Sequence, residues 1–392
     1  MPDPGVVTIA RKEFFDHIRS HRFLILLGIL LLVVSMGVLS GTADYHAKVK
    51  QYDSIQKSVS SSPGGESSLP AYLEYMFVKP SVLLVFYKMS LLFVMIGGIL
   101  GIAMGFDLVT REKESKSLKI LLAHPVYRDE VINGKALGGI AAIALALIIV
   151  LVLAFGILLI AGIVPEGSEF LFISLFALAT FLYISTCFAI SLLMSTICEE
   201  SGKALIYSLV LFIILTSLVP TVVSTPLAMK TIIGPQPEMP QVLADQILAS
   251  VPGSGSDASG SAAQADAPAT DPNQDLWDRY NEQTREYGDR QMRLRDIQYL
   301  FSPAKNYEKI TTCLTSPDMI RYMLYFTMIE SPLQKTDAQG QELSATIAYM
   351  PDLSFDESGL LSLIAGNLIA LLVLPSVFFG LAYVRFMRMD IR

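Results

Sequence analysis

Six stretches of the chain are almost free of polar residues and are long enough to cross a membrane. A bilayer core about 30 Å thick requires about 20 apolar residues in a helix that rises about 1.5 Å per residue. The pattern therefore predicts an all-α integral membrane protein with six transmembrane helices: Phe23–Leu39, Ser81–Phe106, Ala136–Val164, Phe170–Ile197, Ala204–Val223 and Gly359–Tyr383.

Residues 1–22, ahead of the first run, show a different pattern. Apolar residues recur there at helical spacing among charged ones: Val7, Ala10, Phe14 and Ile18. This pattern predicts an amphipathic elbow helix that lies at the membrane surface. A cleaved signal peptide is the competing interpretation, because Gly41 and Ala43 are placed like a cleavage site. The amphipathic helix favours an uncleaved anchor.

Basic residues give the expected orientation. They gather before the first run, in the loop 107–135 and in the tail after the last run, whereas the hairpin turn 165–169 has none. Because short cytoplasmic loops carry an excess of Lys and Arg, we expect a multi-pass protein of the plasma membrane with both termini in the cytoplasm. Domain boundaries follow: helices one to five occupy 23–223, and helix six with its tail occupies 359–392.

The segment 224–358 then lies outside the cell as an insert between helices five and six. It holds 19 acidic and 10 basic residues, and we expect it to be mostly helical. Residues 251–275, rich in Gly, Ser, Ala, Asp and Pro, are typical of a flexible stretch. A stripe then repeats every seven residues and predicts one helix of about 25 residues: Tyr280, Tyr287, Leu294 and Phe301.

Composition agrees with this division into apolar and polar parts. Of the 392 residues, 52% are hydrophobic and 17% charged, and the net charge is −7. A soluble protein has about 25% charged residues. The acidic balance argues against nucleic-acid binding, and three Cys exclude a disulfide-rich scaffold. Met319, Met323 and Met328 could suggest a soft-metal site, but no His or paired Cys of the external segment supports one, so no metal site is expected.

Motifs of catalysis are missing from the sequence. Gly134-Lys135 and Gly202-Lys203 are each followed by Ala and lack a Gly-rich loop upstream, so neither is a Walker A motif. No zinc-protease or nucleophile-elbow motif occurs. We expect a chain that is not an enzyme and that binds no cofactor.

A few residues inside the runs stand out. Lys88 is a charge about seven residues from an outer end, so it and Asn367 are candidates for a translocation path. Snorkelling of Lys88 and interhelical hydrogen bonding by Asn367 are the structural alternatives. Gly97, Gly101 and Gly105 predict close helix packing, within the chain or across a dimer.

The loop 107–135 has a regular arrangement of apolar and charged residues that a solvated linker would not need. Leu118, Leu121 and Leu122 form an apolar face on a short charged helix that Pro125 stops. Apolar anchors within a charged rim are what docking of a cytosolic partner requires.

This loop resembles the signature of ABC-2-type transporter permeases, in the branch of the nitrous-oxide-reductase (multicopper enzyme) maturation and sodium-export permeases. The matching positions are Glu112, Lys113, Glu114, Ser117, Leu118, Leu121, Leu122, Pro125, Arg128, Val131, Ile132, Gly134 and Lys135, and the loop departs from the family at Lys116, usually Gly. The elbow segments 10–14 and 19–23 are similar to the family as well, and 301–304 more weakly.

The resemblance implies a permease subunit of an ATP-driven exporter. Separate ATPase subunits, which hold ATP and Mg, would dock on the loop, and two permeases would pair as a homodimer or with a second permease. The ATPase-coupling residues it implies are Arg111, Glu112, Glu114, Leu118, Leu121, Leu122, Pro125, Arg128, Gly134 and Lys135.

A membrane-anchored receptor or mechanotransmission protein is the alternative, in which the external segment binds a partner and nothing is transported. The substrate is not readable from the sequence. The scarcity of charge in the spans slightly favours a hydrophobic or amphipathic cargo.

Overall fold

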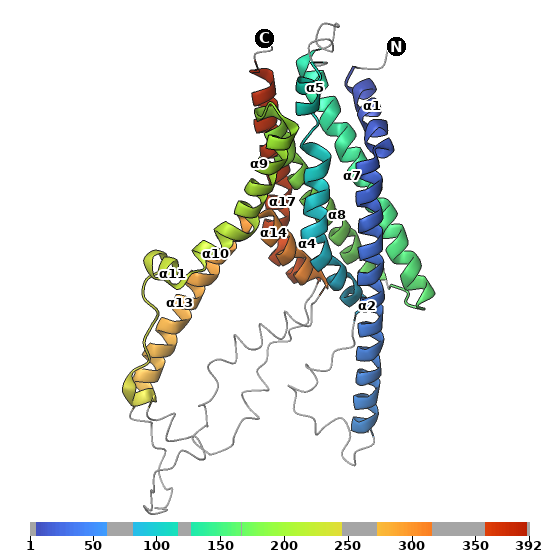
Figure 1. Cartoon of the computed structure of the whole chain (residues 1–392). Helices are drawn as coiled ribbons and strands as arrows, with labels where there is room; N and C mark the ends of the chain where they lie inside the picture. The colour runs from blue at the N-terminus through green and yellow to red at the C-terminus, as the bar shows by residue number, and fades with distance from the viewer. Residues whose placement is uncertain are drawn as a thin grey trace, which may run out of the picture. The chain divides into compact units, whose positions relative to one another are not determined.

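The computed structural model describes residues 5–60, 81–116, 127–165, 167–244, 273–315 and 357–389. The regular structure of these residues is helical (Figure 1). The chain forms two compact units. The first comprises Met1–Pro220, Tyr299–Leu324 and Leu353–Arg392, and the second comprises Thr221–Gln298 and Tyr325–Asp352.

Six helices among the described residues are long and apolar enough to span a membrane, which confirms the predicted fold class. In chain order, the six spans are formed by α2, by α4 with α5, by α7, by α8, by α9 with η2 and α10, and by α17. Their bounds are α2 His21–Ser60, α4 Leu83–Gly105, α5 Thr110–Glu114, α7 Arg128–Ile160, α8 Gly167–Ile197, α9 Ser201–Ile213, η2 Ile214–Leu218, α10 Val219–Val223 and α17 Glu357–Met387.

Two of these helices extend beyond the apolar runs. Helix α2 has 40 residues and continues to Ser60, because the chain between Gly41 and Ser60 contains no Gly or Pro to stop it. Helix α7 begins at Arg128. Its first turn carries Asp129 and Glu130, which suit the positive end of a helix, and a Glu130 carboxylate oxygen accepts from the Tyr127 backbone N–H at 3.3 Å.

The fifth span contains a π-helical turn, η2, between α9 and α10. Pro220 follows η2 after one residue, Val219, and has no N–H to donate to the helix turn before it. A single π turn next to such a proline lets the helix continue with a local change of pitch.

Helices α4 and α8 pack closely through the three glycines of α4. A Cβ added at Gly101 would lie 2.6 Å from the carbonyl oxygen of Ile184, and one at Gly105 would lie 2.7 Å from that of Phe188. Gly97 faces the Ile184 side chain. The glycine stripe therefore contacts a helix of the same chain.

Helix α14, Pro303–Thr315, packs against α4, α8 and α17 of the first unit. Nine of its residues are buried: Pro303, Ala304, Asn306, Tyr307, Ile310, Thr311, Cys313, Leu314 and Thr315. This helix falls inside the segment 224–358 that the sequence predicts to be external. That segment thus contributes a helix to the packed bundle.

The second unit contains α11, Pro226–Ile232, and all but the last three residues of α13, Gln274–Phe301. The Thr225 hydroxyl caps the start of α11 by accepting from the Ala228 N–H at 3.4 Å. Helix α13 includes the stripe of seven-residue spacing. The predicted flexible stretch 251–275 lies mostly outside the described residues.

Candidate functional site

The first described helix, α1 (Gly5–Arg19), packs against the start of α7. Two glycines of α7 allow this approach: a Cβ at Gly134 would lie 2.7 Å from the Cβ of Ile9, and one at Gly138 would lie 2.8 Å from the carbonyl oxygen of Ala10. The close packing brings Glu13 of α1 next to Lys135 of α7.

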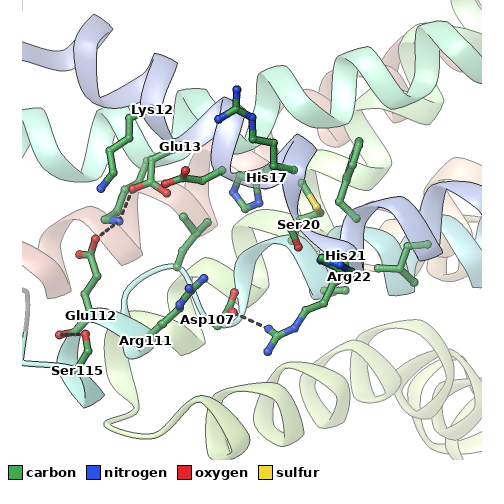
Figure 2. A pocket seen from close by; sticks show the side chains of 18 residues that line it. Lys12, Glu13, His17, Ser20, His21, Arg22, Asp107, Arg111, Glu112 and Ser115 are labelled. Carbon is green, nitrogen blue, oxygen red and sulfur yellow. Dashed lines mark hydrogen bonds and ion pairs between the residues drawn. The ribbon is translucent and has the colours of Figure 1, made fainter.

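Lys135 is the most deeply buried charge of this region, with 2% of its side chain exposed. Its Nζ donates to a carboxylate oxygen of Glu13 at 2.8 Å and of Glu112 at 2.7 Å. Glu13 of α1 and Glu112 of α5, both labelled in Figure 2, thus share one ammonium. A charge buried this far is tolerated when it is paired and hydrogen-bonded, so one ammonium holds α1, α5 and α7 together.

A second ion pair joins the start of α2 to the turn between α4 and α5. Arg22 donates to a carboxylate oxygen of Asp107 at 2.6 Å (Figure 2). The Arg22 side chain is mostly exposed while that of Asp107 is 17% exposed. This pair is weaker in energetic terms than the one at Lys135, because water screens it.

Helix α5 is also fixed to the end of α8. The Lys113 Nζ donates to the carbonyl oxygens of Thr196 and Cys198, each at 2.8 Å, and of Ser195 at 3.3 Å. The last carbonyls of a helix lack partners within it and carry partial negative charge. The Ser195 hydroxyl in turn accepts from the backbone N–H groups of Val109 and Thr110, at 3.0 and 3.1 Å.

Two further bonds reach other helices. A Glu114 carboxylate oxygen accepts from the backbone N–H of Ser201, the first residue of α9. Arg128, at the start of α7, donates to the carbonyl oxygens of Met387 and Met389, at 3.5 and 3.0 Å, where α17 ends. We call the eight charged residues that make these interaction sets around α5 and the start of α7 the polar junction: Glu13, Arg22, Asp107, Glu112, Lys113, Glu114, Arg128 and Lys135.

A cavity of about 810 Å³ opens beside the polar junction, between α1, the start of α2, the end of α4 and α5 (Figure 2). Burial lowers the pKa of His17 on its wall, against the opposing effect of the Glu13 and Asp107 carboxylates. Its other polar lining residues include Lys12, Asp16, Arg19, His21 and Arg111.

The structure brings together several of the residues expected to couple to an ATPase. Glu112 and Lys135 share an ion pair, Glu114 and Arg128 bind the ends of other helices, Gly134 contacts α1, and Arg111 lines the cavity. Four others lie outside the described residues: Leu118, Leu121, Leu122 and Pro125.

The two candidates for a translocation path occupy different settings. Lys88 pairs with Asp44 of α2 at 3.1 Å, and both side chains are partly exposed. Asn367 of α17 is 5% exposed, and its Nδ2 has no hydrogen-bond partner within the described part of the chain. No hydrogen bond or ion pair joins these two residues in that part.

Sequence reasoning missed Glu13, Asp107 and Ser195 as members or supports of this site. Glu13 lies off the stripe formed by Val7, Phe14 and Ile18, and its burial comes from the contact of α1 with Gly138 of α7, so the periodicity of the helix does not mark it. Among the described residues, no group of three His, Cys, Asp or Glu is placed to hold a metal ion.

Six apolar helices define a multi-pass membrane protein. Hydrogen bonds and ion pairs join the ends of these helices on one side of the bundle. The particular family follows from comparison with known proteins: the chain matches the ABC-2 family transporter protein model over residues 7–391. The chain therefore belongs to the ABC-2 transporter family, as a membrane subunit. No curated protein matches it significantly.

Proposed function

We propose that this chain is the permease subunit of an ATP-driven ABC exporter. A separate ATPase, which holds ATP and Mg, docks on the loop 107–135 and drives substrate across the plasma membrane. Two such permeases pair, as a homodimer or with a second permease. Both termini are cytoplasmic in this proposal, and α1 lies at the membrane surface.

The observation that carries the proposal is how firmly both flanks of the loop are held. On the N-terminal flank, Glu112, Lys113 and Glu114 bond to α7, α8 and α9. On the C-terminal flank, Arg128 bonds to the end of α17 and Lys135 to α1. Since the flanks reach these five helices, displacement of the loop would move the helices with it.

A rigid connection of this kind is what coupling requires. Coupling between two sites needs an element with two arrangements that both sites can bias. Helices joined by buried charge pairs move as one body, because separating the charges in a low dielectric is costly. ATP-dependent movement of the docked ATPase would thus tilt the spans together.

The test uses the permease purified with its ATPase partner. Replacing Leu118, Leu121 and Leu122 with Asp should abolish complex formation and transport-coupled ATP hydrolysis. The matched control replaces Leu171, Val152 and Met95, exposed apolar residues of three spans, with Ala and should leave the complex intact. An intact complex in the triple Asp variant would contradict the docking assignment.

Inverted membrane vesicles separate the proposal from a receptor role. An exporter accumulates substrate inside such vesicles when ATP is added, and a membrane-anchored receptor does not. Lack of accumulation with an ATPase complex that still hydrolyses ATP would favour mechanotransmission.

A further inference from the structure

Helix α14 holds a completely buried amide that has no hydrogen-bond partner among the described residues. The Asn306 side chain is 0% exposed. Within the described part of the chain, neither its Nδ2 nor its Oδ1 has a hydrogen-bond partner. Buried polar atoms in proteins are nearly always hydrogen-bonded, so an amide with both ends unpaired calls for a physical reason.

The depth of this amide follows from its neighbour Tyr307. The Tyr307 ring stacks on that of Tyr183 with centroids 4.8 Å apart, and its hydroxyl lies 3.1 Å from the Thr180 Oγ1. Thr180 is eleven residues into the span that begins at Glu169. At about 1.5 Å per residue this is about 16 Å, close to the middle of a core about 30 Å thick.

The start of α14 therefore lies deep among the spans. Ser302 precedes the helix and is 1% exposed, and its carbonyl oxygen accepts from the Asn306 backbone N–H at 2.9 Å. The Lys305 N–H donates to the Ser302 Oγ at 3.4 Å. The backbone N–H groups of Lys305 and Asn306 are thus bonded, and the Asn306 side chain, unpaired in the described part of the chain, lies at the end of the first turn, near the partially positive helix end.

The helices that pack against α14 contribute uncharged polar groups. Lys305 and Glu308, the charged residues nearest to Asn306 in sequence, pair with each other at 2.7 Å. Three buried groups on α17, α8 and η2, which pack against α14, lack a partner within the described part of the chain: the Asn367 Nδ2, the Ser185 Oγ and the Thr216 Oγ1. These unpaired groups are an amide and two hydroxyls, and none is an ion.

We propose that the Asn306 amide, near the start of α14, binds the uncharged head group of an amphipathic cargo molecule. An amide both donates and accepts, so it matches a carboxamide or hydroxyl that does the same. An ion would have to lose its water without a counter-charge, which is costly at this depth. The inference rests on the proposed transport function, but its test needs no ATPase.

The first experiment measures thermal unfolding of the full-length permease alone in lipid nanodiscs. Asn306→Leu should raise the unfolding temperature by about 2 °C, because it removes an unpaired buried amide and keeps the branching and the number of heavy atoms of the side chain. Thr312→Leu, on a partly exposed position of the same helix, should change it little. A lower unfolding temperature in Asn306→Leu would show that the amide has a structural partner and would overturn the proposal.

The second experiment measures binding with two photoreactive probes of the same chain length, a diazirine fatty amide and its fatty carboxylate. The amide should label peptides of α14 and α8 in the parent protein and in Thr312→Leu. Labelling should fall about tenfold in Asn306→Leu through loss of two hydrogen bonds, and the carboxylate should label neither helix. Equal labelling in Asn306→Leu, or by the carboxylate, would overturn the proposal.

These results are readable whether or not an ATPase docks on the loop 107–135. Failure of the docking test with selective amide labelling would leave a ligand site in a protein coupled some other way. If the ATPase docks but labelling is not selective, the exporter proposal is supported and the binding of a head group by Asn306 is contradicted.

Discussion

The polar junction and the start of α14 each contain a buried polar group, Lys135 and Asn306. The two groups differ in their pairing with other side chains. At the junction, the Lys135 ammonium is matched by two carboxylates within 2.8 Å. At α14, the Asn306 amide has no partner in the described part of the chain. The Lys135 ammonium, held by both carboxylates, specifies one arrangement, although the Glu112 Oε2 beside it has no partner among the described residues. The Asn306 amide is unpaired at both ends, and we propose that it binds a ligand. In our proposals, the polar junction connects helices mechanically, and the start of α14 binds a ligand.

The largest effect is expected from removing the cation of the junction. Lys135→Met leaves Glu13 and Glu112 facing each other without a counter-charge, which should lower the free energy of unfolding by about 3–5 kcal/mol. Denaturant titration in detergent micelles measures it. The control Lys203→Met removes an exposed pair with Glu200 and should change stability little. Similar losses in the two variants would contradict the importance of burial.

A charge-balanced variant sharpens the same point. Replacing Glu13 and Glu112 with Gln in the Lys135→Met background removes the uncompensated charges, so most of the lost stability should return. Coupled ATP hydrolysis should not return with it, because the ionic tie between α1, α5 and α7 is gone. Recovery of both would show that the junction serves stability alone.

An intermediate effect is expected at the contact between α1 and α7. In Gly138→Ile the new Cβ would meet the backbone oxygen of Ala10, which cannot rotate away, so the variant should lose about 1–3 kcal/mol of stability. The control Gly156→Ile lies on the same helix with nothing within 4 Å of the added Cβ. Thermal unfolding of the two variants measures the difference, and equal midpoints would contradict the close packing.

A smaller effect is expected near α14. Tyr307→Phe removes the hydroxyl that pairs with Thr180 but keeps the stacked ring, so it should cost about 1 kcal/mol. Tyr207→Phe changes an exposed tyrosine and serves as the control. The denaturant midpoints of Tyr307→Phe and Tyr207→Phe are compared. If Tyr307→Phe lost as much stability as Lys135→Met, the expected difference between the two regions would be contradicted.

The smallest effect concerns pH. Burial lowers the pKa of His17, opposed by Glu13, Asp107 and Asp16 and assisted by Lys135. The unfolded chain therefore binds a proton at higher pH than the folded one. The stability this provides is complete above the unfolded pKa of about 6.5 and is lost as pH falls below it. Unfolding midpoints between pH 7.5 and 5.5 should decline less in His17→Gln, and an equal decline would contradict the role of His17.

The spans were predictable from sequence because each needs only length and hydrophobicity, properties local to the run. The loop residues Glu112 and Lys135 were also recognisable, through a motif. Their third partner, Glu13, was not, because its contact depends on how α1 crosses α7, which the spacing of Gly134 and Gly138 allows but does not specify. The place of α14 was missed for a related reason. A helix of 13 residues with polar positions resembles a surface helix until the packing partners are known.

The bond between Glu13 and Lys135 joins residues separated by 122 positions. During synthesis at about 5–20 residues per second, α1 leaves the ribosome some 6–24 seconds before its partner exists. For that interval Glu13 has no Lys135 ammonium to pair with, so the buried ion pair cannot form. The N-terminal helix can therefore take its folded position only after the third span, α7, has been made. Folding of the subunit thus depends on the order in which its helices are synthesised.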